Sequence, residues 1–549
     1  MSQIPNPPKK RTWQYVCLIA ILLLGVMVWF NIPTPLRISA ETTYILGPMM
    51  PDGKRIDYFR AMEERFYPPE MKTDDNGYRI LARALGRKVW RRETTNPTLG
   101  ELFSPASGWL QICEKLGLDP NEEPATSFKI ESPRLLIDPS GKFWVPSMPF
   151  WTFEDYPMLK DWLEENTEGI DLLAEAVRKP VFFIPFVHDK DVPLFHTASS
   201  GAQQDWAEAV HARAAYRLGI GDIDGAVDDI VTLHRLARHI GKQMTLLSWV
   251  LGGWIEDLGS GTGIGSNPKF SPTAEQIERL ITELKALPPR QPLSEILEME
   301  RYQHLARLQY AHYHSKSRRY GGTLFARNRH WLMDINVIME TINKDIDKKC
   351  SGNLDIEERN CSWNPLPYLF IRSRTDRIVR SMIDLSLVGV QENRRSIECR
   401  GNMYILTLAL LLYEKDHGTL PDGDWREAVR PYLGENSDKY FRCPSYRELA
   451  EGETTYAMIG GVPNPVASPN QILIVEVFQP QKLGEGEGRF PFDKAVFGNK
   501  RDDGFDGLGS RHAGGINVGL RSGAVIFTLE VTKPDELRQL FDGTATTLP

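Results

Sequence analysis

The sequence predicts an α+β protein with an N-terminal transmembrane helix, a mainly α-helical body and a C-terminal module in which a long helix packs on an antiparallel sheet. Three observations lead to this prediction. A long apolar run lies close to the start of the chain, apolar residues recur at helical spacing through the middle, and short β-like runs punctuated by Gly and Pro follow near the end.

The composition is that of a globular protein with several domains. At 549 residues the chain is long enough for about three or four domains. Hydrophobic residues make up 41% and charged residues 25%, which excludes wholesale disorder and a polytopic membrane protein. The net charge of −7 argues against a general nucleic-acid binder, and six cysteines are too few for a disulfide scaffold.

The N-terminal segment has the pattern of a membrane anchor. The first forty residues contain no acidic side chain, and Lys9, Lys10 and Arg11 precede an apolar run from Trp13 to Phe30. A run of about 18 residues is the lower limit for crossing the hydrocarbon core and is long for a signal peptide. Trp13 and Phe30 stand where interfacial aromatic side chains are expected.

The positive flank predicts the orientation of the chain. Because basic flanks stay in the cytoplasm, residues 1–12 are expected to form a cytoplasmic tail and residues 13–30 a single-pass anchor, with the bulk of the chain periplasmic or extracytoplasmic. The alternative is a signal peptide that is removed. The nearest candidate cleavage sequence, Ile38-Ser39-Ala40, has a large residue where a small one is needed, so we expect the anchor to be retained.

The exported part is expected to fold in three consecutive stretches. Residues 31–150 mix short helices and loops, residues 151–375 form a helical domain, and residues 376–549 form an α+β domain. We expect this last domain to fold alone, with its long helix, from about Asp376 to Asp416, packed on its own sheet.

In the helical domain, two helices should form a hairpin through residues 219–222, where Gly supplies a stop and Asp an N-cap. This hairpin resembles one tetratricopeptide unit, at Ala212, Ala215, Leu218, Gly219, Ala226 and Asp229. No second copy is visible, so a repeat array is not predicted.

The C-terminal stretch carries an ordered series of motifs over residues 385–545. Its motif residues are Cys399, Cys443, His512, Gly514, Gly515, Ser522 and Gly523. The stretch resembles the globular domain of the prepilin-like proteins of planctomycete bacteria, whose ending is a His, nine residues and Asp-Gly. This resemblance implies a pilin-like (pseudopilin-like) domain of unknown function. Ser522 stands in place of the family's Asp, so the acidic position is lost.

The segment before this module departs from the resemblance. True prepilins have an apolar helix there that packs in the filament core. This chain has six charged residues instead, namely Arg372, Arg374, Asp376, Arg377, Arg380 and Asp384. A filament core or a membrane rejects such charges, so we expect a module that does not polymerise.

The cysteines and acidic loops offer candidate structural sites. Cys350 and Cys361 flank a short loop and are a candidate disulfide in an oxidising exterior. A second disulfide between Cys399 and Cys443 is an open alternative, because pairing is not deducible from spacing. A calcium site at Asp502, Asp503 and Asp506 is another candidate, and the alternative for these three residues is a solvated turn.

The sequence contains no recognisable catalytic motif. There is no nucleophile elbow and no phosphate-binding loop, and the Gly-rich stretch 259–265 follows a helix and is expected to be a linker. His234 and His239 lie about 140° apart on a helix, so they do not converge on one metal. We therefore expect no catalytic, metal or cofactor-binding residues.

The expected function is that of a non-catalytic, membrane-anchored envelope protein acting through contacts with an unknown protein partner. One alternative is an adaptor or component of a type II secretion-like machine, and another is an exported hydrolase that uses His512 as its base.

Overall fold

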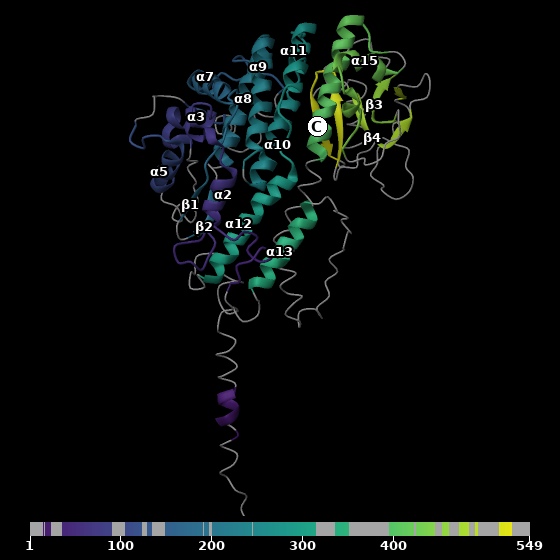
Figure 1. The fold of residues 1–549 in the computed structure, drawn as a ribbon. Coiled ribbons are helices and arrows are strands. Elements are labelled where there is room, and N and C mark those ends of the chain that lie inside the picture. Colours follow the sequence, from purple (N-terminus) through teal and green to yellow (C-terminus); the bar gives the residue numbers. More distant parts are fainter. Residues whose placement is uncertain are drawn as a thin grey trace, which may run out of the picture. The chain divides into compact units, whose positions relative to one another are not determined.

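The computed structural model describes fifteen ranges of the chain and Tyr15. The ranges are 17–22, 36–89, 105–122, 129–133, 149–189, 192–196, 200–243, 245–313, 335–350, 395–421, 424–444, 453–460, 472–482, 489–491 and 515–529. Their helices and strands are drawn in Figure 1.

The chain divides into two compact units, each made of stretches that are separate in the sequence. Unit 1 comprises Met1–Tyr67, His188–Phe195 and Pro292–Ser386. Unit 2 comprises Pro68–Val187, His196–Gln291 and Leu387–Pro549. This division is discontinuous, whereas the sequence leads us to expect consecutive domains. The expected boundaries at residues 31, 151 and 376 stay a prediction.

Unit 1 is built on two long helices, α12 (Leu293–Tyr313) and α13 (Ile335–Cys350), with the shorter α2 (Tyr58–Phe66) packed on α12. A two-stranded ribbon pairs β1 (Val187–Asp189) with β2 (Val192–His196). The buried Tyr302 of α12 makes edge contacts with the rings of Tyr44, Tyr58 and Phe66. These ring contacts fix α2 and the segment before it against α12.

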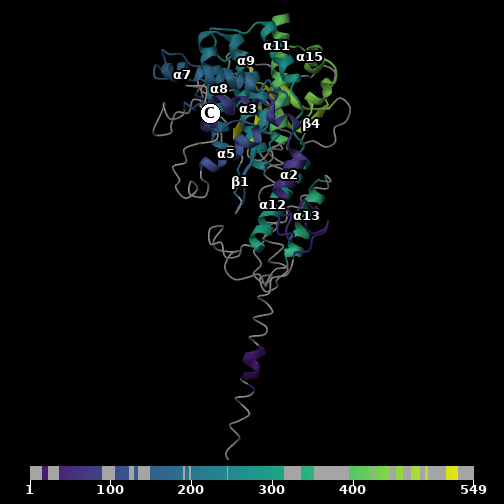
Figure 2. The same ribbon diagram turned by 60° about the vertical axis from the view of Figure 1, so that its left-hand side comes forward.

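Unit 2 contains most of the helices in the part of the chain that the structure describes. They are α3 (Gly77–Leu85), α5 (Pro105–Leu116), α7 (Leu159–Ala176), α8 (Ser200–Ile220), α9 (Ile223–Ile240), α10 (Leu246–Gly261), α11 (Ala274–Lys285), a helix over residues 395–417, and α15 (Trp425–Leu433). Short 3-10 turns lie at Pro69–Lys72, Gly86–Val89 and Ser437–Phe441. Helices α8, α9 and α10 lie side by side (Figure 1), and α8 and α9 are also adjacent in the turned view (Figure 2).

The predicted hairpin between α8 and α9 is confirmed. Gly221 adopts a left-handed φ of 82°, and the side chain of Asp222 caps α9 by accepting from the Gly225 amide at 3.0 Å. A β-carbon on Gly219 would clash with the carbonyl oxygen of the buried Trp151, so the hairpin lets two backbones approach closely there.

The strands of unit 2 form one five-stranded sheet with the order β5-β3-β4-β6-β7. Its strands are β3 (Glu453–Gly460), β4 (Ile472–Lys482), β5 (Arg489–Pro491), β6 (Gly515–Leu520) and β7 (Val525–Leu529). All neighbours pair antiparallel except β3 and β5, which pair parallel. Gly523, with a φ of 82°, supplies the tight turn between β6 and β7.

The core of unit 2 joins its helices to this sheet. One continuous cluster of buried apolar side chains includes Ile230 of α9, Leu280 of α11, Leu406 and Leu410 of the helix 395–417, and Ile474 of β4. The helix 395–417 packs on its own sheet, as expected, but the expectation that this stretch completes its core alone is wrong. Side chains from α9 and α11 complete that core.

The predicted α+β fold class is also wrong, because the described part of the chain is mainly helical. The physical reason is the shared core: the helix 395–417 extends the packing of the helical body instead of forming a separate helix-on-sheet module. Among the described residues, no helix has both the length and the apolar character needed to cross a membrane. Of the expected anchor, only Tyr15 and residues 17–22 are described, and these are helical.

Candidate functional site

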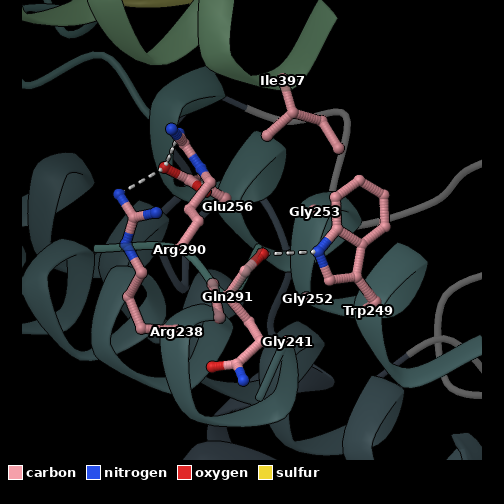
Figure 3. A pocket seen from close by; sticks show the side chains of 10 residues that line it. Arg238, Gly241, Trp249, Gly252, Gly253, Glu256, Arg290, Gln291 and Ile397 are labelled. Atoms are coloured by element: carbon pink, nitrogen blue, oxygen red, sulfur yellow. Dashed lines mark hydrogen bonds and ion pairs between the residues drawn. The ribbon is translucent and has the colours of Figure 1, made fainter. Parts of the chain in front are cut away.

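A small pocket in unit 2 lies beside a group of buried charged side chains (Figure 3). It lies among α9, α10, the residues after α11 and the start of the helix 395–417. Its lining residues are Ala237, Arg238, Gly241, Trp249, Gly252, Gly253, Glu256, Arg290, Gln291 and Ile397.

Glu256 of α10 is the centre of this group. Its carboxylate is buried and accepts hydrogen bonds from two arginines. Arg290 donates from Nε to Oε2 at 2.9 Å and from Nη2 to Oε1, and Arg238 donates from Nη2 to Oε1 at 3.1 Å. Burial alone opposes the charge on Glu256, but Arg290 and Arg238 outweigh it and lower its pKa to about 2. Glu256 is therefore ionised at neutral pH.

The next residue of α10 makes a second ion pair in a different direction. Asp257 accepts two hydrogen bonds of 2.7 Å from Nε and Nη2 of Arg400, which belongs to the helix 395–417. Nη1 of Arg400 also donates to the hydroxyl of Ser396 at 2.7 Å. Adjacent carboxylates of α10 thus hold both the segment after α11 and the C-terminal helix.

His234 of α9 lies beside Glu256 and is buried. Its Nδ1 is 3.9 Å from Oε1 of Glu256, and its ring stacks on Tyr404 at a centroid distance of 5.8 Å. Burial lowers the pKa of His234 to about 4, so its ring is neutral at pH 7. His239 has a separate partner, since its Nε2 lies 3.0 Å from the carbonyl oxygen of Val177.

Two glycines allow these elements to approach closely. A β-carbon on Gly253 would clash with Cδ1 of Ile397, and one on Gly401 would lie 2.7 Å from Nη2 of Arg290. The side chain of Ile397 therefore fills the space that Gly253 leaves open on α10. On the opposite side of the pocket, Nε1 of Trp249 donates to the Gln291 carbonyl oxygen at 3.3 Å.

The arrangement is suited to holding helices together. A carboxylate with a pKa of about 2 is a weak base at neutral pH, and both its oxygens already accept hydrogen bonds from guanidinium groups. We call Glu256, Asp257, Arg238, Arg290 and Arg400 the ion-pair clamp. It joins α9 and α10 to the helix 395–417.

The two cysteines of the C-terminal motif lie in the shared core. Cys399 and Cys443 are both fully buried, and neither is in a disulfide. The hydroxyl of Tyr456 donates to Sγ of Cys399 at 3.1 Å. The alternative of a second disulfide between these cysteines is therefore wrong in this structure.

The last motif residues surround the turn between β6 and β7. Gly515 begins β6, Ser522 is buried in the turn, and Gly523 follows it. The Ser522 carbonyl oxygen accepts from the amide of Gly265 at 2.8 Å, and a β-carbon on Gly263 would come within 2.7 Å of that oxygen. The Gly-rich stretch is therefore packed against this turn, not a free linker.

The basic residues 9–11, the charged segment 372–384 and the remaining candidate site residues lie outside the described residues. These remaining candidates are Trp13, Phe30, Cys361, Asp502, Asp503, Asp506, His512 and Gly514, and for Cys350 only the backbone is described. The candidate disulfide, the candidate calcium site, the ends of the anchor and the base of the hydrolase alternative stay predictions.

The ion-pair clamp was not predicted from the sequence. One signal was present: Glu256 and Asp257 are the only charged residues in α10, an otherwise apolar and Gly-rich helix. A carboxylate pair in such a helix indicates buried partners, because an unpaired buried charge is strongly unfavourable. The positions of those partners, Arg290 and Arg400, are not deducible from spacing.

Comparisons of the chain with protein-family models, with curated proteins and with solved structures find no match. The resemblance to prepilin-like proteins stays a prediction from the motifs alone.

Proposed function

We propose that the protein is a membrane-attached envelope protein that acts through contacts with another protein and not by catalysis. One observation supports attachment to the membrane. Within residues 17–22, four apolar side chains are more than half exposed: Leu18 at 61%, Ile19 at 57%, Ile21 at 69% and Leu22 at 61%. A helix that exposes apolar side chains in this way is stable in hydrocarbon and not in water.

The ion-pair clamp supports a structural role for the charged groups of unit 2. Glu256 and Asp257 are engaged by Arg238, Arg290 and Arg400. Removing one partner of a buried ion pair is strongly destabilising, because it leaves the other charge buried without compensation. We propose that these residues maintain the shape of unit 2 for a partner protein.

The apolar side chains of the helix 395–417 are covered within unit 2. Leu406, Leu408 and Leu410 are fully buried within unit 2. These side chains are already covered by the protein's own core, so they are not available for contacts between copies of the chain. The segment that corresponds to the filament helix of true prepilins, residues 372–384, lies outside the described residues. We propose that the chain does not polymerise through this helix.

Membrane attachment predicts how the chain fractionates. The full chain should pellet with membranes, resist extraction at high pH and dissolve in detergent, since hydrocarbon contacts are insensitive to alkali. A variant lacking residues 1–35 should be released to the soluble fraction. In intact spheroplasts, protease added outside should degrade the bulk of the full chain.

A charge variant is the matched control. Replacing Lys9, Lys10 and Arg11 by Gln removes the orienting charges but leaves the apolar run, so this variant should stay resistant to alkali while its protease accessibility becomes mixed. Release of the full chain at high pH, or complete protection from external protease, contradicts the proposal.

A further inference from the structure

His234 lies where three elements of unit 2 meet. It belongs to α9, and its buried ring stacks on Tyr404 of the helix 395–417 at a centroid distance of 5.8 Å. On its other side it meets α10, where a β-carbon on Gly259 would lie 2.8 Å from Nε2 of the ring. The ring of His234 therefore fills the junction of α9, α10 and the helix 395–417.

This junction suits a neutral imidazole and not a protonated one. Neither ring nitrogen of His234 has a hydrogen-bond partner among the described residues. Oε1 of Glu256 is 3.9 Å from Nδ1, which is too far for a hydrogen bond, and it already accepts from Arg238 and Arg290. An imidazolium has two N–H donors and a positive charge, so it is strongly disfavoured where no acceptor is in reach.

The charges around His234 are balanced while its ring is neutral. Arg238 of α9, Arg290 after α11 and Glu256 of α10 act on the ring, and Figure 3 shows Glu256 between the two arginines. Glu398 of the helix 395–417 acts on both arginines and completes the balance. The neighbouring ion pair of Asp257 and Arg400 adds no net charge, and burial raises the pKa of Tyr404, so its phenol is uncharged. A proton on His234 therefore adds one uncompensated positive charge.

We propose that His234 is an acid-sensitive latch of unit 2: when its ring takes up a proton, the shared core opens where α9, α10 and the helix 395–417 meet. Opening lets water solvate both N–H groups of the imidazolium, and it uncovers the buried side chains of Leu406, Leu408 and Leu410. Acid thereby exposes an apolar helix face that is covered at neutral pH.

Proton binding gives the latch its pH range. In the closed state burial lowers the pKa of His234 from 6.5 to about 4, whereas in the open state the ring has its ordinary value. The open state therefore binds more protons between pH 6.5 and 4. The stability of the closed state is constant above that range and falls as the pH decreases through it.

The test is native-state hydrogen exchange of the full chain in detergent at pH 7.5 and pH 5, corrected for the intrinsic exchange rates. His234→Gln keeps a polar side chain that takes up no proton. Between the two pH values, the opening equilibrium constant of α9 and the helix 395–417 should rise about 20-fold more in the wild-type chain than in this variant. Equal rises in the two chains overturn the proposal.

Two features of the design isolate His234. The rings of His211 and His239 are also buried in unit 2, and they contribute equally to the wild-type chain and to His234→Gln, so the difference between the chains belongs to His234. His417→Gln is the matched control, because His417 is exposed at the end of the helix that carries Tyr404. This control should keep the wild-type rise, and an equal loss of the rise in both variants contradicts the latch.

A second measurement does not depend on the folding of these variants. Deuterium exchange at Cε1 of each histidine, read by tandem mass spectrometry of the wild-type chain, reports the pH at which its ring becomes protonated. The midpoint for His234 should be far lower in the folded chain than in the chain unfolded by urea. Coincident midpoints overturn the proposal.

Discussion

A fragment spanning residues 374–549 should fail to reach a native state when it is expressed alone. In the full chain, its helix 395–417 packs against apolar side chains of α9 and α11, among them Val227, Ile230, Ile277 and Leu280. Each fully buried aliphatic side chain contributes about 1.5–3 kcal/mol, and a domain is stable by only about 5–15 kcal/mol. Loss of several such contacts exceeds that margin.

Near-ultraviolet circular dichroism and urea titration of the fragment provide the measurement. We expect little fixed aromatic signal, a broad transition without cooperativity, and binding of a hydrophobic dye. Co-expression with residues 68–291 supplies α9 and α11 and should restore a cooperative transition. A fragment that unfolds cooperatively by itself contradicts the shared core.

The substitution Glu256→Gln should lower the free energy of unfolding by about 3–5 kcal/mol, because it leaves the buried Arg238 and Arg290 without their carboxylate. Glu427→Gln is the matched control. Glu427 pairs with Arg430 on the surface and its side chain is 63% exposed, so its loss should cost less than about 1 kcal/mol. Urea titrations of both variants measure the difference, and equal costs contradict the role of Glu256.

The pH dependence gives this prediction a second readout. The pKa of Glu256 is lowered from 4.5 to about 2 in the folded protein. Its stabilising contribution is therefore complete above pH 4.5 and is lost as the pH falls toward 2, where the folded carboxylate becomes protonated. The difference in stability between the wild-type chain and Glu256→Gln should shrink over that window. A difference that stays constant down to pH 2 contradicts the assignment.

Local signals in the sequence predicted several helices well. Helix α11, Ala274–Lys285, has such signals at both ends, because Thr273 forms a capping box with Gln276 and two prolines follow at 288 and 289. The turn between α8 and α9 follows from Gly221 and Asp222 in the same way. Such signals act over a few residues, so they are visible in one sequence.

The shared core and the ion-pair clamp were not predictable in this way. The partners of Glu256 and Asp257 include Arg290 and Arg400, and Arg400 lies 143 positions after Asp257. Apolar periodicity shows that the helix 395–417 has a buried face, but it does not show which element covers that face. We expected the nearby sheet to cover this face, whereas α9 and α11 also pack against it.

Native-state hydrogen exchange on the full chain tests most directly the central claim that the C-terminal helix and the helical body of unit 2 form one core. If they do, the slowest amides of the helix 395–417 and of α9 should exchange with the same opening free energy, because neither element opens without the other. Glu256→Gln should lower both values by the same amount. Exchange of the helix 395–417 at a clearly lower free energy, while α9 stays protected, contradicts a shared core.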